Sequence, residues 1–422
     1  MKEVVDNFKK ISKIPHCSFD TKKLCNFLVD FAKKNGCEVK LDSAFNIHCI
    51  KGKPKLCLQS HYDMVCMGEA PNIELKEENF LLKAVNSSLG ADNGMGVAMM
   101  MQIIKDFDNI ECIFTNDEEV GLIGANNLEH KIKSKLLLNL DHEVENEVVI
   151  GCAGGLDIKA SLNINLKEEE GELYELEAIN FKGGHSGIDI ISNEKNSIKE
   201  MAAFILKNNG KIVYFEGGER INSIARYAKA RVFFKKTPKD SKYIKCKYLG
   251  LKKEKIIKQN SKLIKAINAF SQGVRAYDKK LGIVRTSINL SLLRMKDKKV
   301  NIELFARSNL LEDLLNLKEE TKIFFSSFGF KLEFHNFYAP WQAKESEFSK
   351  VVLNSLKKKV KNAKILEVHA GLECGIIEKK QKINCVSIGP NIYNPHSTDE
   401  KCDLKSLERI YEVLKDVVKI YG

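Results

Sequence analysis

The spacing of apolar residues predicts helices at both ends of the chain. Residues 3–12 and 20–35 carry apolar side chains at helical intervals, with Ile14-Pro15 between them. Residues 93–105 are apolar nearly all round, which is typical of a helix buried against a sheet. Two amphipathic segments follow near the C-terminus, at 346–360 and 403–420.

Short apolar runs bounded by turns predict buried strands between these helices. They cover residues 56–60, 110–115, 136–140 and 384–388. Because strands and helices alternate, we expect an α/β fold with a mixed sheet flanked by helices.

The pattern changes after Gly154-Gly155. Residues 156–180 alternate apolar and polar positions, as antiparallel strands do, and a Gly-rich segment follows at 182–187. We therefore expect a discontinuous α/β domain of residues 1–158 and 340–422. An α+β domain of residues 159–339 is inserted into it.

The composition is that of a globular protein. The chain has 422 residues, of which 44% are hydrophobic, and this suits two globular domains. Its start lacks a signal-peptide pattern, and no apolar run is long enough to span a bilayer. The twelve cysteines form no CxxC pairs at zinc-site spacing. Free, mostly buried thiols and a cytoplasmic location are expected.

The net charge of +12 comes from lysines spread along the whole chain. The densest basic stretches, after Leu251 and Leu356, lack interleaved aromatic residues. A solvated basic surface is the favoured interpretation, so neither nucleic acid nor membrane is expected as a partner.

Acidic and histidine residues follow several of the predicted strands. Ligands bind at the carboxyl ends of strands in open α/β sheets. Carboxylates gathered there would repel one another without a cation, and a carboxylate and imidazole set suits zinc, manganese or cobalt. Taken singly, each residue could be an ordinary loop or helix-start residue. The residues are His61, Asp63, Asp92, Glu118, Glu119, Asp141 and His396.

Seven stretches resemble, in order, the aminoacyl-histidine dipeptidases of the two-metal aminopeptidase-like hydrolases. They are LQSHYDMVCMG (58–68), LGADNGMGVA (89–98), FTNDEEVGLIGA (114–125), LNLDHE (138–143), FKGGHSGIDI (181–190), VHAGLECGII (368–377) and GPNIYNPHSTDE (389–400).

The resemblance implies a role for each residue at the strand ends. His61 and Asp141 hold one metal, Glu119 and His396 hold the other, and Asp92 bridges the two. Asp63 orients His61. Glu118 acts as the general base. The peptide bond between Asp92 and Asn93 is expected to be cis, as is typical of the family. Zinc is the expected metal, with manganese or cobalt as alternatives.

The inserted domain becomes a substrate-binding lid in this interpretation. His185 would donate a hydrogen bond to the oxyanion. Asn222 would lie near the substrate carbonyl, and Arg307 would bind the substrate carboxylate. Glu373, in the α/β domain, would bind the free amine or act as a ligand. Structural roles are the alternatives for these residues: a loop histidine packed against glycines for His185, an ion pair for Arg307 or Glu373.

The chain departs from the family pattern in places. Thr398 stands where proline is frequent, and His142 stands where serine is frequent, so His142 could compete for metal or support a ligand. The chain also looks shorter than typical members, with the missing length expected in the lid.

The expected activity is metal-dependent hydrolysis of unblocked dipeptides, with Xaa-His dipeptides implied by the family. Two alternative functions use the same metal-dependent hydrolysis: an N-acyl amino acid deacylase and a di- or tripeptidase of broader specificity. A non-catalytic binding protein is opposed by the complete set of ligand residues. A homodimer is the expected assembly.

Overall fold

A computed structural model of the chain describes residues 1–279 and 281–421 and contains two compact units. Unit 1 comprises Met1–Cys152, Trp341–Glu367 and Leu372–Gly422, and unit 2 comprises Ala153–Pro340 and Val368–Gly371. The sequence placed the breaks after residues 158 and 339, whereas the units divide after Cys152 and Pro340. The short excursion of residues 368–371 into unit 2 was not expected.

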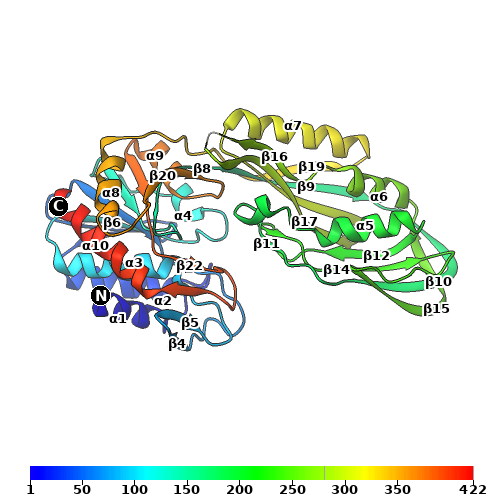
Figure 1. Cartoon of the computed structure of the whole chain (residues 1–422), viewed down its shortest axis with the longest axis horizontal. Helices are drawn as coiled ribbons and strands as arrows, with labels where there is room; N and C mark the ends of the chain where they lie inside the picture. Colours follow the sequence, from blue (N-terminus) through cyan, green and yellow to red (C-terminus); the bar gives the residue numbers. More distant parts are fainter. Residues whose placement is uncertain (280, 422) are drawn as a thin grey trace. The chain divides into compact units, whose positions relative to one another are not determined.

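Unit 1 is built on an eight-stranded mixed sheet (Figure 1). Its central strands β6, β3, β7 and β21 run parallel to one another, and β2 and β8 flank them antiparallel. In spatial order the strands are β1 (Glu38–Leu41), β2 (Ile47–Lys51), β6 (Ile110–Thr115), β3 (Leu56–His61), β7 (Leu136–Asn139), β21 (Asn384–Ser387), β8 (Glu147–Cys152) and β20 (Lys364–Val368).

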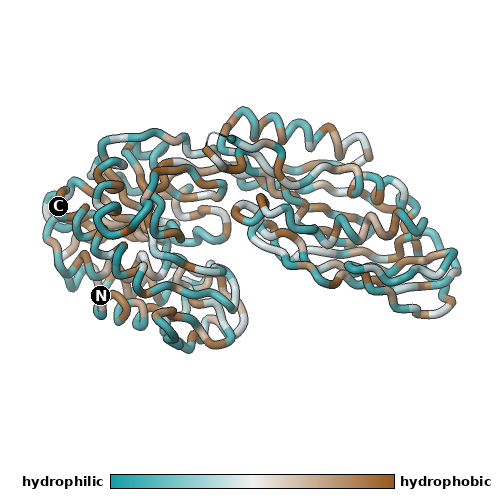
Figure 2. The backbone as a smooth tube through the Cα atoms, in the orientation of Figure 1, coloured by the Kyte–Doolittle hydropathy of each residue, from teal (hydrophilic) through white to brown (hydrophobic). Residues whose placement is uncertain are grey.

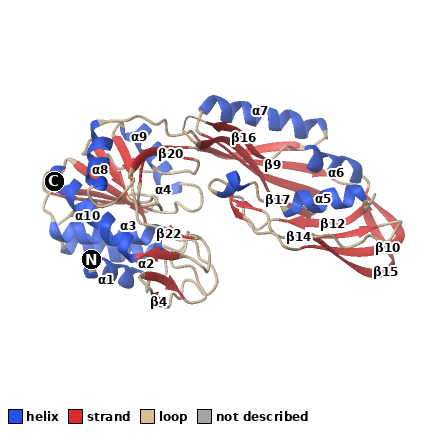
Figure 3. Cartoon of the chain, viewed as in Figure 1, coloured by secondary structure: helices blue, strands red, loops and turns tan. Residues whose placement is uncertain are grey.

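Helices flank this sheet, as Figure 3 shows. The central strand β3 is buried along its whole length, as expected of a parallel strand covered on both faces. The helices of the unit are α1 (Lys2–Ile11), α2 (Lys22–Lys34), α3 (Ala91–Asp106), α4 (Ile123–Asn126), α8 (Glu347–Lys357), α9 (Cys374–Gln381) and α10 (Leu404–Tyr421).

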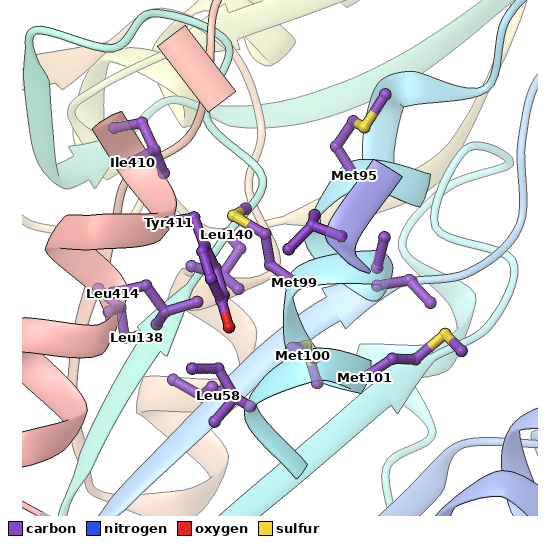
Figure 4. Packing of buried hydrophobic residues seen from close by; sticks show 14 of the residues in the cluster. Leu58, Met95, Met99, Met100, Met101, Leu138, Leu140, Ile410, Tyr411 and Leu414 are labelled. Carbon is purple, nitrogen blue, oxygen red and sulfur yellow. The ribbon is translucent and has the colours of Figure 1, made fainter. Parts of the chain in front are cut away.

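Helix α3 lies in the middle of one buried cluster, which explains its apolar sequence. Its methionines are fully buried and belong to the same cluster as Leu58 of β3 and Leu138 of β7 (Figure 4). Tyr411 and Leu414 of α10 belong to the same cluster. The flexible thioether side chains of Met95, Met99, Met100 and Met101 point in different directions from the helix and fill irregular space around it.

A small four-stranded sheet completes unit 1, in the order β22 (Ile392–Tyr393), β23 (Lys401–Asp403), β5 (Leu81–Ala84) and β4 (Leu75–Glu78). It pairs the segment after residue 390 with the segment before α3. His396 lies between β22 and β23, and Asp92 follows β5 at the start of α3, so the small sheet brings the regions of two expected metal ligands toward each other.

Unit 2 is a nine-stranded antiparallel sheet with helices packed on one face. One buried cluster joins the sheet to α5 (Ser197–Lys207), α6 (Asn260–Ala269) and α7 (Leu311–Ser327). The sheet contains β9 (Gly154–Asn163), β10 (Leu166–Ala178), β12 (Lys211–Gly217), β14 (Ala228–Phe233), β15 (Ile244–Ile257), β16 (Gly273–Asp278), β17 (Ile283–Lys296), β18 (Lys299–Ser308) and β19 (Lys331–Tyr338).

Beside that sheet, β11 (Gly184–His185) pairs with β13 (Ser223–Ile224), and a 3-10 turn covers Asp189–Ser192. Hydrophilic and hydrophobic residues alternate along the elements of both units (Figure 2), as expected of elements with one buried and one solvated face. Among the described residues, no helix has the length and apolar character needed to cross a bilayer.

The cysteines depart from expectation at one place. Cys17 and Cys66 form a disulfide with their Cα atoms 5.5 Å apart. The segment around Cys17 lies beside Met64, whose N–H donates to the carbonyl of His16 at 3.1 Å, and this contact places the two sulfurs in range. The prediction of free thiols is therefore wrong for this pair, whereas the other ten cysteines are free.

Candidate functional site

The sheet of unit 1 brings the predicted residues to one edge. His61 is the last residue of β3 and pairs with Thr115, the last residue of β6. Asp141 follows β7, which runs parallel to β3 on its other side. Because parallel strands end at the same edge, the residues that follow them meet there.

Asp92 lies between the two histidines of this edge. Its Oδ1 is 3.1 Å from Nε2 of His61, and its Oδ2 is 2.9 Å from Nε2 of His396. Nε2 of His61 also lies 3.2 Å from Oδ1 of Asp141, and Nε2 of His396 lies 2.8 Å from Oε1 of Glu119. Each oxygen of Asp92 therefore faces a different pair of side chains. The bond between Asp92 and Asn93 is cis, as expected.

Asp63 lies behind these side chains and contacts two of the segments that carry them. Its backbone carbonyl is 3.1 Å, and its Oδ1 3.4 Å, from Nδ1 of His61. Its carboxylate also accepts the main-chain N–H groups of Glu118 at 2.9 Å and Glu119 at 3.3 Å. With Nδ1 held in this way, Nε2 of His61 is directed toward Asp92 and Asp141.

The electrostatics of this edge call for a cation. Burial raises the pKa of Glu118 well above its usual range, and the neighbouring Glu119 and Asp141 carboxylates raise it further. Burial also raises the pKa values of Glu119 and Asp141. Carboxylates so buried are costly to ionise without a counter-charge.

Three groups of ligand atoms are compact enough to hold a metal ion, with their atoms within 4.8 Å of one another. The donors are imidazole nitrogens and carboxylate oxygens, the set that zinc, manganese and cobalt accept. The groups are His61 with Asp92 and Asp141, Asp92 with Glu119 and His396, and His61 with Glu118 and Glu119.

Glu373 lies at the start of α9 and is fully buried. Its Oε2 accepts hydrogen bonds from Nε2 of Gln59 and Oγ1 of Thr115, both at 2.6 Å, and its Oε1 has no partner within the described part of the chain. Burial raises the pKa of Glu373 to about 7. The side chain is held by residues of β3 and β6, and Glu373 forms no ion pair within hydrogen-bonding distance in the described part of the chain.

In unit 2, the hydrogen bonds of His185 define its tautomer. Nδ1 is placed to accept the main-chain N–H groups of Gly187 at 3.3 Å and Ile188 at 3.2 Å. A neutral imidazole that accepts at Nδ1 carries its proton on Nε2, so Nε2 is a hydrogen-bond donor. The main-chain N–H of His185 donates to Asp189 at 2.8 Å, which anchors the loop.

Arg307 lies across Gly187 from His185. A Cβ at Gly187 would come within 2.5 Å of the backbone carbonyl of His369, and close to Cε1 of His185 at 3.1 Å and Nε of Arg307 at 3.2 Å, so only glycine fits there without displacement. Arg307 is 4% exposed, donates from Nη1 to the hydroxyl of Tyr338 at 3.2 Å, and stacks on Phe305. Its Nε has no hydrogen-bond partner among the residues the structure describes.

Asn222 belongs to the same corner of unit 2. Its carbonyl accepts the N–H of Ser186 at 2.8 Å, and the next residue, Ser223, pairs with His185. His369 is also there: its Nε2 is 2.8 Å from Oγ of Ser287, and its Nδ1 is 3.0 Å from Oδ1 of Asn309. Unit 2 thus gathers the three residues expected to contact substrate.

Some residues of these sites escaped the sequence analysis. Ser18 donates to Asp63 at 2.8 Å, and no pattern in the sequence marks it. Glu400 accepts main-chain hydrogen bonds from the turn that carries Asp92. Glu400 is the last residue of the stretch 389–400 that resembles the family, so the sequence did offer a signal for it. His142 belongs to none of the three metal-ligand groups, and its Nε2 lies 2.9 Å from Oε2 of Glu147.

Known proteins resemble this chain along almost its whole length. The cytosol non-specific dipeptidase of Escherichia coli is 29% identical, over 98% of this chain and 96% of that protein. The crystal structure of aminoacylhistidine dipeptidase from Vibrio alginolyticus is 26% identical with a TM-score of 0.74, and covers 100% of this chain and 96% of its own.

A tripeptidase from Staphylococcus aureus shares the fold at 18% identity, with a TM-score of 0.62 and coverage of 99% and 98%. The family model for Peptidase family M20/M25/M40 matches residues 57–420, which include every predicted site residue. The predictions of an aminopeptidase-like α/β fold and of a metallopeptidase are confirmed. The chain belongs to peptidase family M20/M25/M40.

Proposed function

We propose that the protein hydrolyses unblocked dipeptides, with Xaa-His dipeptides as preferred substrates, using two divalent metal ions. His61, Asp92 and Asp141 would hold one ion, and Asp92, Glu119 and His396 the other, with zinc expected first. The observation that carries this proposal is the position of Asp92, whose two oxygens face different histidines at 3.1 and 2.9 Å. A carboxylate so placed can bridge two ions.

Divalent ions at this centre supply Lewis-acid polarisation of the scissile carbonyl and make a bound water more acidic. Glu118 takes the proton of the attacking water and delivers it to the leaving amine. Its backbone is fixed by Asp63, which also faces His61. Because Asp63 contacts both residues, it fixes the position of the proposed base relative to the proposed metal ligand.

The residues of unit 2 handle the substrate in this proposal. His185 donates its Nε2 proton to the oxyanion of the tetrahedral intermediate. Arg307 binds the terminal carboxylate, which its buried guanidinium and unpartnered Nε favour. Asn222 lies beside the strand pair that holds His185 and would contact the substrate carbonyl. Glu373 supports the strand ends from behind through Gln59 and Thr115.

The two related proteins differ in their stated specificity, one being a non-specific dipeptidase and the other an aminoacylhistidine dipeptidase. The preference for histidine is therefore the part of the proposal that most needs a test. A cytoplasmic location and assembly as a homodimer complete the proposal. The name of the Escherichia coli relative, a cytosol dipeptidase, favours the cytoplasmic location. Light scattering on the purified protein tests whether it is a homodimer.

The test is hydrolysis of β-Ala-His, Gly-His, Leu-Gly and an N-acetyl amino acid by protein stripped with a chelator, then reloaded with zinc, manganese or cobalt. We expect cleavage of the free dipeptides only after reloading, with the histidine peptides cleaved fastest. Equal rates on Leu-Gly would remove the histidine preference. Cleavage of the acetylated compound alone would replace the proposal by the deacylase alternative.

A further inference from the structure

Glu400 is a buried carboxylate that holds four consecutive main-chain N–H groups. Its Oε2 accepts from Leu89 at 2.8 Å and Gly90 at 3.1 Å, and its Oε1 accepts from Ala91 at 2.8 Å and Asp92 at 3.3 Å. The residue is 2% exposed. Both oxygens are therefore used on a single turn, in an arrangement that suits an ionised carboxylate.

The turn held by Glu400 could not satisfy these groups by itself. Gly90 has a φ of 69°, and Asp92 has φ −80° and ψ 108°, so the chain is not helical at either residue. The first N–H groups of a helix have no partner inside the helix, and they need one when the helix start is buried. Here the partner comes from a residue 311 positions further along the chain than Leu89.

Glu400 and His396 reach Asp92 from the same loop. His396 faces the side chain of Asp92 at 2.9 Å, and Glu400 holds its main-chain N–H. The loop is closed on itself by a hydrogen bond from the N–H of Glu400 to the carbonyl of Ser397 at 3.3 Å. The backbone of one expected ligand and the loop of another are thereby fixed by a single carboxylate.

We propose that Glu400 is a positioning residue for the metal centre: it fixes the turn of Asp92 so that each carboxylate oxygen faces one ion, and it ties the loop of His396 to that turn. The inference rests on the proposed assignment of Asp92 and His396 as ligands. A simple helix cap would stabilise the protein equally with and without metal, whereas a positioning residue contributes to metal affinity.

The test is Glu400→Gln, which keeps the shape of the side chain but replaces one acceptor oxygen with an amide that faces two N–H groups. Zinc affinity is measured by competition with a chromophoric chelator. We expect it to weaken by about 10- to 100-fold, the usual range for groups that support metal ligands. We expect kcat to fall with little change in KM. Asp399→Asn, at the exposed neighbouring residue, is the matched control and should keep wild-type affinity.

Thermal unfolding with and without zinc separates the two roles. We expect the rise in melting temperature on adding zinc to be smaller in Glu400→Gln than in wild type. If Glu400→Gln lowered the melting temperature equally with and without zinc and left the zinc affinity unchanged, Glu400 would be a structural helix cap and the inference would be overturned. Should Glu400→Gln fail to fold, Glu400→Asp keeps the charge on a shorter side chain, and wild-type affinity in that variant would overturn it.

Asp92→Asn distinguishes this inference from the proposed function. If Asp92→Asn loses zinc while Glu400→Gln keeps it, only the role of Glu400 is wrong. If Asp92→Asn binds two zinc ions as tightly as wild type, the assignment of the centre itself is wrong.

Discussion

Oδ1 of Asp63 accepts the main-chain N–H of Glu118 at 2.9 Å and also lies 3.4 Å from Nδ1 of His61. One carboxylate therefore fixes the orientation of an imidazole on β3 and the position of the turn after β6. This arrangement suits the different roles that we propose for the adjacent Glu118 and Glu119. Their backbone is held by Asp63, and Glu119 faces His396, which would leave Glu118 for proton transfer.

Replacing Glu118 by glutamine should separate metal binding from turnover. The amide keeps the size of the side chain but cannot take a proton, so we expect kcat to fall by about 10²- to 10⁴-fold. Zinc content should stay at the wild-type value. Both are measured on the same reloaded preparation, with the exposed Glu77→Gln as the control. Turnover within a few-fold of wild type would remove Glu118 as the base.

His185→Ala should lower turnover and leave the metal centre intact. Loss of the Nε2 donor removes one hydrogen bond to the oxyanion, and a kcat lower by about 10²- to 10³-fold is expected. His335→Ala, at an exposed site of the same unit, serves as the control. Loss of zinc from His185→Ala would instead identify His185 as a ligand.

Arg307→Lys should weaken the recognition of the free carboxylate. Lysine keeps the charge but loses the planar pair of donors, so we expect kcat/KM for Gly-His to fall by about 10- to 100-fold. The corresponding peptide amide lacks the carboxylate and should be cleaved equally slowly by both proteins. An equal loss on peptide and amide would show that Arg307 supports the fold through Tyr338 and Phe305. Arg231→Lys, at a half-exposed position, controls for the substitution itself.

Stability should depend on pH through Glu373. Burial raises its pKa in the folded chain from 4.5 to about 7. Between these values the folded state keeps a proton that the unfolded state has released, so the free energy of unfolding falls as pH rises through this window. Glu373→Gln removes the contribution of this residue to the pH dependence and, in metal-free protein, should be more stable than wild type by about 3 kcal/mol at pH 8.

Urea unfolding of the chelator-stripped proteins at pH 4.5 and pH 8 measures the effect. The two proteins should have similar stability at the lower pH. A variant that is less stable than wild type at pH 8 would contradict the prediction, because it would mean that the charged carboxylate is favourable where it lies.

Local patterns were sufficient for many of the elements, and they drew attention to the acidic and histidine residues that follow the strands. The run at 56–60 appears as β3 and the amphipathic segment at 403–420 as α10, each within a residue or two. The spacing of apolar residues indicates which faces of an element are buried, and the faces predicted to be buried in β3 and α10 are buried in the structure. His61 and Asp141 were placed because they directly follow such runs.

Contacts between distant segments could not be predicted in this way. Glu400 bonds a turn 311 positions earlier, and Glu373 bonds Gln59 across 314 positions. A carboxylate in a loop has the same local pattern whether it is solvated or holds a buried turn, because its partners depend on tertiary packing. The disulfide between Cys17 and Cys66 escaped prediction for the same reason.

The excursion of residues 368–371 into unit 2 has a consequence for shortening the chain. A variant that joins Cys152 to Trp341 would look like a clean removal of the inserted unit. It would keep His369, however, while losing Ser287 and Asn309, which hydrogen-bond both nitrogens of its ring. An α/β unit that folds alone will need a substitute for this four-residue loop as well as a deletion of the insert.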